Sequence, residues 1–176
     1  MSEFHDDAKG RLSDDKAIAK VRDLLPRFRS AMLITRSGGS DAPHVRPMGL
    51  LGDLASFGGT LWFFADDRSR KVQELSDDPH ASLVFQSDDA SRYMHLNGRA
   101  SAVADRAKMR ELFTPLIKTW FPEGLDDPNL TLIRFDAENG AFWDSPGGML
   151  QVLAAFTKSV VTGVPGKGGR MGTLEM

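Results

Sequence analysis

The chain has 176 residues, which suits one domain with a single hydrophobic core rather than two domains. Its 22 basic and 24 acidic residues give a formal net charge of −2, so it lacks the positive field that nucleic-acid binding requires. It contains no cysteine, which excludes disulfides, thiolate metal sites and cysteine nucleophiles.

The N-terminal residues 1–7 are acidic, and no apolar segment follows them as it would in a secretory signal. No other stretch of the chain has the apolar length that a membrane-spanning helix needs. We therefore expect a cytoplasmic protein whose partners include neither nucleic acid nor membrane.

An amphipathic helix is predicted to begin at Ser13, because Ile18, Val21, Leu25 and Phe28 recur at helical spacing behind a capping residue. The apolar run 31–35 then predicts a buried strand. A loop over 37–41 follows it, so residues 43–51 are expected to form its hairpin partner.

The middle of the chain predicts three more strands and two helices. The aromatic segment 61–65 favours a strand, as does the apolar segment 80–85. Between them Ser69 is placed to cap a short helix that ends at Asp78-Pro79. Clean alternation over 93–104 predicts a long strand with one face toward solvent or a cofactor, followed by a helix from Asp105 that Pro115 kinks or splits.

The last third predicts a strand pair over 130–136 and 140–143. A closing helix is expected from four apolar residues, namely Met149, Leu150, Leu153 and Phe156. We place a single domain over 1–162 and a glycine-rich, flexible tail over 163–176. Because the links have hairpin length, the fold class is mainly β with peripheral helices, arranged as an antiparallel barrel.

The most informative local motif is Arg68-Ser69-Arg70-Lys71, at the predicted start of the short helix. Cations at a helix N-terminus oppose the helix dipole unless an anion is present. The Ser69 hydroxyl, free backbone N–H groups and the charges of Arg70 and Lys71 together suit a phosphate. The alternative is a solvated basic turn.

Arg46 is the second candidate, on the predicted second strand with His44 and Met48 on the same face. Its neighbours are largely apolar, and burying an arginine is costly without a partner. Phosphate is one natural partner, and a salt bridge to Asp or Glu is the alternative.

Four aromatic side chains could flank a planar ring: Trp62, Phe63, Tyr93 and Trp143. Aromatic residues of this kind more often belong to the core. The histidines show no metal-ligand spacing, so we expect no metal site. Dinucleotide-binding, P-loop and nucleophile-elbow motifs are also missing from the sequence.

In chain order these segments resemble the pyridoxamine 5'-phosphate oxidase-like FMN-binding split barrel, in its general stress protein 26-like branch. The resemblance spans about Ser13 to Val161 and rests on five segments: Val45-Arg46-Pro47-Met48-Gly49, Leu61-Trp62-Phe63-Phe64-Ala65, Ser69-Arg70-Lys71, Arg92-Tyr93-Met94-His95-Leu96-Asn97-Gly98-Arg99 and Ala141-Phe142-Trp143-Asp144-Ser145. It implies a split barrel of six to seven antiparallel strands and a homodimer with flavin at its seam. The cofactor contacts that it implies are Arg46, Pro47, Met48, Trp62, Phe63, Phe64, Ser69, Arg70, Lys71, Tyr93 and, from the second chain, Trp143.

The sequence departs from the vitamin B6 oxidases at positions that bind their substrate. Leu51 stands where those enzymes have lysine, and Glu111 and Pro115 stand where they have tyrosine and arginine. We therefore expect an FMN-dependent oxidoreductase that is not a true vitamin B6 oxidase, with FAD as the other flavin considered and NAD(P)H or a small redox substrate as its partner. No catalytic acid or base is identified, and two alternatives stay open: a flavin carrier or sensor without turnover, and a split barrel that binds deazaflavin or haem.

Overall fold

The computed structural model describes residues 14–37, 40–88, 91–144 and 170–176. Within these residues seven strands are present: β1 (Ser30–Ser37), β2 (Ser40–Gly49), β3 (Thr60–Asp66), β4 (His80–Gln86), β5 (Arg92–Val103), β6 (Leu130–Asp144) and β7 (Arg170–Glu175). The helices are α1 (Asp14–Leu24), α2 (Arg70–Asp77) and α3 (Arg106–Leu112), with four short 3-10 turns: η2 (Leu25–Arg27), η3 (Leu54–Ser56), η4 (Pro115–Thr119) and η5 (Gly124–Asp126).

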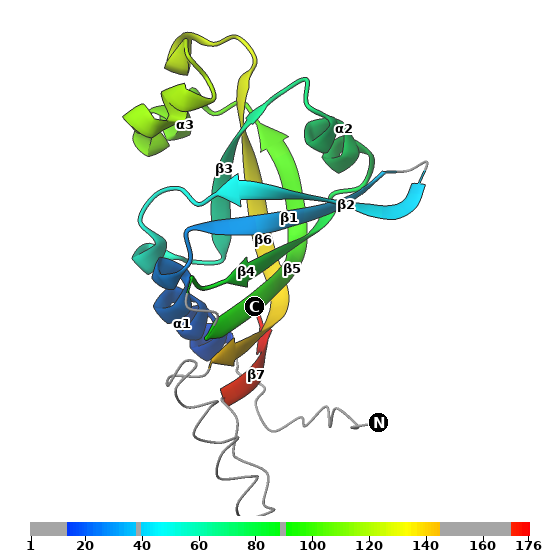
Figure 1. The fold of residues 1–176 in the computed structure, drawn as a ribbon, viewed down its shortest axis with the longest axis vertical. Coiled ribbons are helices and arrows are strands. Elements are labelled where there is room, and N and C mark those ends of the chain that lie inside the picture. The colour runs from blue at the N-terminus through cyan, green and yellow to red at the C-terminus, as the bar shows by residue number, and fades with distance from the viewer. Residues whose placement is uncertain (1–13, 38–39, 89–90, 145–169) are drawn as a thin grey trace, which may run out of the picture.

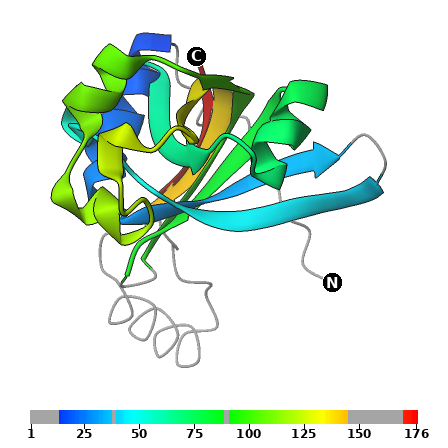
Figure 2. The ribbon, with the colours of Figure 1, turned by 90° about the horizontal axis from the view of Figure 1, so that it is seen from above.

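All strand pairs are antiparallel, and the strands follow the order β2-β1-β4-β5-β6-β3, with β7 added beside β6. The sheet curves around an inner core, with helices at its margins (Figure 1, Figure 2). Its two end strands, β2 and β3, are not neighbours in the hydrogen-bonded order. This open seam makes the barrel a split one, as predicted.

Two apolar cores lie on opposite sides of this sheet. The inner core combines inward-facing strand residues such as Leu33, Phe63, Leu83 and Phe135 with the apolar face of α1. The outer core lies over β3 and β6 and contains six buried residues: Phe64, Met109, Leu112, Ile117, Leu130 and Leu132. Among the described residues, the helical segments after β5 cover only this half of the outer surface, and no other described helix covers the rest of it.

Strand β6 is longer than the sequence predicted. Residues 130–136 and 140–143 were expected to form two strands, but they are parts of one 15-residue strand. A register shift between Asn97 and Gly98 of β5 lets β6 bend without ending. Close backbone approach requires glycine at Gly98 and Gly140, because an added Cβ would collide with the carbonyl oxygens of Asp136 and His95.

The end of the chain corrects another prediction. The segment 163–176 was expected to be a flexible tail, but Arg170–Glu175 forms β7 and pairs with β6 from Asn139 to Asp144. Gly172 and Leu174 are buried while Thr173 and Glu175 are exposed, a strand alternation that the overall glycine content obscured. Residues 163–169 and the predicted closing helix at 149–156 lie outside the described residues.

The predicted helix after Asp105 is split as expected. Helix α3 ends at Leu112, and Pro115 opens the separate turn η4. The Asp105 carboxylate accepts hydrogen bonds from the backbone N–H groups of Ala107 and Lys108 and so caps α3. No helix among the described residues has the length and apolar character needed to cross a membrane.

Candidate functional site

The first half of the candidate site lies at the N-terminus of α2. Ser69 is the N-cap residue, and Arg70 and Lys71 occupy the first turn of the helix. Contrary to the prediction, the Ser69 side chain makes no capping hydrogen bond, and its Oγ is buried with no hydrogen-bond partner among the described residues. A buried hydroxyl without a partner is costly, so this oxygen marks a place where a polar ligand would be stabilised.

Glu74, one turn further along α2, draws the neighbouring polar side chains together. Its carboxylate is 3% exposed and accepts hydrogen bonds from Thr35 Oγ1 at 2.5 Å and Arg46 Nη2 at 2.7 Å. The other oxygen lies 2.9 Å from Arg70 Nε and 2.6 Å from His44 Nδ1. The salt bridge considered for Arg46 is therefore present, and it connects β2 to the predicted phosphate-binding turn.

The charges of this cluster shift two pKa values. Burial alone would raise the pKa of Glu74, but hydrogen bonds from Thr35 and Arg46 and the charges of Arg46 and His44 hold it below its ordinary value. Burial, followed by repulsion from Arg46, lowers the pKa of Lys71, and this lysine forms no salt bridge with any described residue. We call Arg46, Ser69, Arg70 and Lys71 the cationic cradle.

The second half of the candidate site is the outer side of strands β2, β1, β4, β5 and β6, which none of the described helices covers and which we call the open face. Strand register arranges its side chains in rows, since directly paired residues share a face. The central row runs Pro47, Met32, Val84, His95, Ala141 and Thr173. A neighbouring row contains the pair Tyr93 and Trp143, which are 40% and 41% exposed.

Trp143 is held in place from both sides of its strand position. Phe142 is buried in the inner core, whereas the Asp144 carboxylate lies 2.9 Å from Lys20 Nζ and 3.1 Å from Arg92 Nε. The His95 ring lies beside the indole, with 5.9 Å between the ring centroids, and burial lowers the pKa of this histidine. The strand end is therefore fixed while the Trp143 ring remains open to a partner. Ser145, the last residue of this motif, lies outside the described residues.

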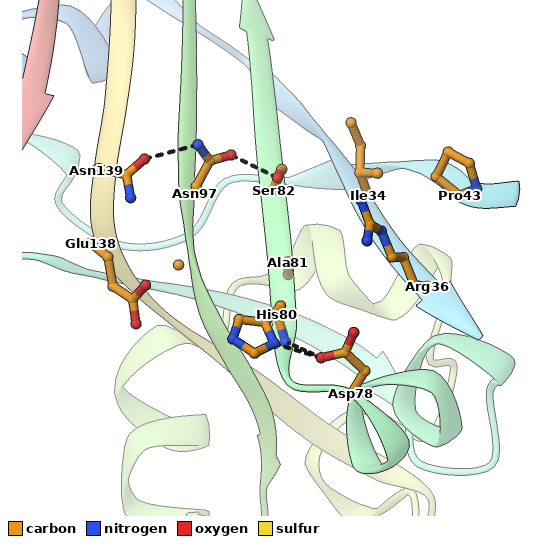
Figure 3. Close-up of a pocket in the computed structure, with 11 residues that line it drawn as sticks. Ile34, Arg36, Pro43, Asp78, His80, Ala81, Ser82, Asn97, Glu138 and Asn139 are labelled. Atoms are coloured by element: carbon orange, nitrogen blue, oxygen red, sulfur yellow. Dashed lines mark hydrogen bonds and ion pairs between the residues drawn. The ribbon is translucent and has the colours of Figure 1, made fainter. Parts of the chain in front are cut away.

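A polar row crosses the same open face (Figure 3). Ser82 Oγ donates to Asn97 Oδ1 at 2.8 Å, and Asn97 Nδ2 donates to Asn139 Oδ1 at 2.9 Å. These side chains form the floor of a hollow of about 520 Å³, with Arg36 and His80 at its sides. The floor side chains hydrogen-bond to one another, and Arg36 and Glu138 also line the hollow.

The remaining predicted cofactor contacts lie in different parts of the barrel, some buried and some exposed. Phe63 is fully buried in the inner core and Phe64 in the outer core, so only their backbone is available to a ligand. Met48 faces inward and Pro47 outward, as strand alternation requires. Trp62 is half-buried, and the Lys108 ammonium lies 5.7 Å from its ring centroid.

A second cavity, of about 280 Å³, lies beside Trp62. Leu51 and Glu111 both line it, although 60 positions separate them in the sequence. Glu111 accepts a hydrogen bond from Lys108 Nζ at 2.6 Å. The structure therefore brings together two of the three positions at which this sequence departs from the vitamin B6 oxidases, and the third, Pro115, is not part of this lining.

Two residues that contact the cationic cradle, Thr35 and Glu74, were not identified from the sequence. Thr35 gave no signal, since it ended an apolar strand. Glu74 was identifiable, because it lies four residues after Arg70 and this spacing places the two side chains on one helix face.

Comparisons with known proteins show which family the chain resembles. A family model described as pyridoxamine 5'-phosphate oxidase like matches residues 16–165. Protein bli-3 of Neurospora crassa is 25% identical over 159 residues, covering 86% of this chain and 76% of that protein.

Solved structures extend the similarity to three dimensions. A general stress FMN/FAD binding protein from Xanthomonas citri is 27% identical, with a TM-score of 0.64 over 77% of this chain and 93% of that one. A Clostridium acetobutylicum protein related to general stress protein 26 of Bacillus subtilis shares the fold at 24% identity. Its TM-score is 0.61, over 78% of this chain and 92% of that one.

Proposed function

The chain belongs to the pyridoxamine 5'-phosphate oxidase-like family, and from this premise we propose that it is an FMN-binding homodimer acting as a flavin-dependent oxidoreductase. The phosphate of FMN binds in the cationic cradle, and the isoalloxazine ring lies at the seam between two chains. The similarity to the FMN/FAD binding protein of Xanthomonas citri supports a flavin as the ligand.

The unpartnered Ser69 hydroxyl carries this proposal. A phosphate at the N-terminus of α2 would accept hydrogen bonds from Ser69 Oγ and from the first backbone N–H groups of the helix. It would also give Lys71 the anionic partner that this half-buried ammonium lacks among the described residues. Arg46 and Arg70 each keep unused N–H donors beyond their contacts with Glu74, since a guanidinium has five.

The open face supports a second copy of this chain as the partner. Five of the exposed large apolar side chains lie on it: Met32, Val45, Val84, Tyr93 and Trp143. A grouped apolar surface of this kind marks an interface more often than a solvated surface. In the proposed dimer Trp143 of each chain covers the flavin held by the other chain.

When bound, the flavin would supply the electron-transfer chemistry. The residues of the chain bind the phosphate, exclude water from the seam with Trp143, and place neutral His95 near the ring. In the second cavity Leu51 stands where the vitamin B6 oxidases have lysine, and Lys108 is paired with Glu111, so we propose that vitamin B6 phosphates are not substrates.

Absorption spectra of the purified protein, followed by titration with FMN, FAD and riboflavin, test this proposal. We expect a flavin spectrum, and an FMN dissociation constant at least about 100-fold below that of riboflavin, because charge-assisted hydrogen bonds contribute about 1.5 to 3 kcal/mol each. A haem or deazaflavin spectrum, or equal affinity for FMN and riboflavin, would contradict it. Oxidation of NAD(P)H by the FMN-loaded protein then separates an oxidoreductase from a carrier.

A further inference from the structure

The buried carboxylate of Glu74 lies behind the cationic cradle rather than in it. Its two oxygens make four contacts within the chain, to Thr35, His44, Arg46 and Arg70. These partners come from three different elements, β1, β2 and α2. Glu74 therefore connects the strand arginine to the helix arginine, which would otherwise be two independent long side chains.

The need for such a connection follows from the exposure of the arginines. The Arg70 side chain is 67% exposed, and holding a free arginine in one conformation costs entropy. Contacts at Nε and Nη2 fix its guanidinium: Nε lies 2.9 Å from Glu74, and Nη2 lies 3.0 Å from His44 Nε2. Arg46 is fixed similarly, through Nη2 to Glu74 and Nη1 to Thr35.

The His44 tautomer follows from the same contacts. A guanidinium only donates hydrogen bonds, so His44 Nε2 must accept from Arg70. In the neutral form of the ring the proton lies on Nδ1, and this nitrogen is 2.6 Å from Glu74 Oε1. His44 thus extends the reach of Glu74 to the end of the Arg70 side chain.

We propose that Glu74 is a positioning residue for phosphate recognition, fixing the Arg46 and Arg70 guanidiniums, the latter partly through His44, before the ligand arrives. This inference rests on the proposed binding of FMN in the cationic cradle. Ligand binding then orders fewer side chains, which raises affinity for the phosphorylated flavin specifically. Riboflavin, which has no phosphate, gains nothing from this arrangement.

The test is the ratio of the riboflavin and FMN dissociation constants in wild-type protein and in Glu74→Asp. Aspartate keeps the charge but shortens the side chain, so electrostatic attraction to phosphate is preserved while the guanidiniums lose their anchor. We expect the ratio to fall about tenfold, because ligand binding must then order two long side chains. Glu74→Gln, which keeps the length and removes the charge, should lower the ratio too.

Asp77→Asn provides the matched control for Glu74→Gln, because it removes the same charge at an exposed position of the same helix. It should leave the ratio of dissociation constants unchanged. If Glu74→Asp does not fold, His44→Ala decides, with an expected fall of about threefold, because one long side chain, Arg70, must then be ordered by the ligand. An unchanged or raised ratio in the folded variant would overturn the role of Glu74. A wild-type protein that does not distinguish FMN from riboflavin would instead overturn the proposed function itself.

Discussion

The two halves of the candidate site differ in how their polar and apolar groups are satisfied. Behind the cationic cradle, one chain supplies the partners of both arginines, and Glu74 is enclosed by groups from β1, β2 and α2. On the open face, by contrast, Tyr93 and Trp143 are held at their backbone while their rings remain about 40% exposed. In the proposed dimer, the phosphate end of the site is therefore built within one chain, whereas the ring end is completed by a second chain.

This contrast makes the cradle sensitive to substitutions that break charge pairs. Arg46→Met removes one partner of a buried carboxylate, so we expect the free energy of unfolding to fall by about 3 kcal/mol. The loss is at the low end of the usual range because Arg70 and His44 still contact Glu74. Urea denaturation of the flavin-free protein measures it.

The matched control is the double variant Arg46→Met with Glu74→Met, which removes both charges. It should lose less stability than Arg46→Met alone, because no buried charge remains unpaired. A single variant as stable as wild-type protein would mean that the Arg46 contact contributes nothing to the cradle.

The open face should respond in the opposite way. Trp143→Ala should leave the free energy of unfolding of the chain nearly unchanged, because the ring is 41% exposed, but it should weaken dimerisation about tenfold. Analytical ultracentrifugation checks the association, and flavin fluorescence checks the ring contact. Trp120→Ala, at a more exposed tryptophan outside the open face, is the control and should change neither. Unaltered dimerisation of Trp143→Ala would exclude this face as the seam.

Acid should weaken the contacts of Glu74 behind the cradle. The pKa of Glu74 is held below its ordinary value of 4.5 in the folded protein, so its stabilising contribution is present above that pH and is lost as pH falls through the folded pKa. We expect a steeper decline of stability below about pH 4.5 in wild-type protein than in Glu74→Gln, with a difference of about 1 kcal/mol per pH unit. Parallel thermal melts across this range would show it, and identical slopes would rule out the Glu74 contribution.

The smallest effect on stability is expected at Lys71, where a substitution should raise the free energy of unfolding rather than lower it. Burial and Arg46 lower the pKa of this lysine, so its charged form destabilises the flavin-free protein at neutral pH, and the penalty vanishes as pH rises through 10.5. Lys71→Met should therefore stabilise the flavin-free protein by less than about 1 kcal/mol while weakening FMN binding. A lower melting temperature in Lys71→Met would show that the charge is compensated without a ligand.

The same contrast explains which features the sequence could predict. The strand arginine and the Ser69-Arg70-Lys71 turn were recognisable because both are local patterns, an alternating strand and a helix start. The role of Glu74 depends on residues 39 positions away at Thr35 and 28 at Arg46, which no local pattern reports. For the same reason β7 was wrongly predicted as tail, since its pairing with β6 is remote in sequence.

The most direct test of flavin binding is a crystal structure of the protein grown with FMN. We expect phosphate oxygens within hydrogen-bond distance of Ser69 Oγ and Lys71 Nζ, and the flavin ring against Trp143 of the partner subunit. An FMN phosphate bound elsewhere, for example beside Arg36 and His80 in the hollow of the open face, would contradict this assignment.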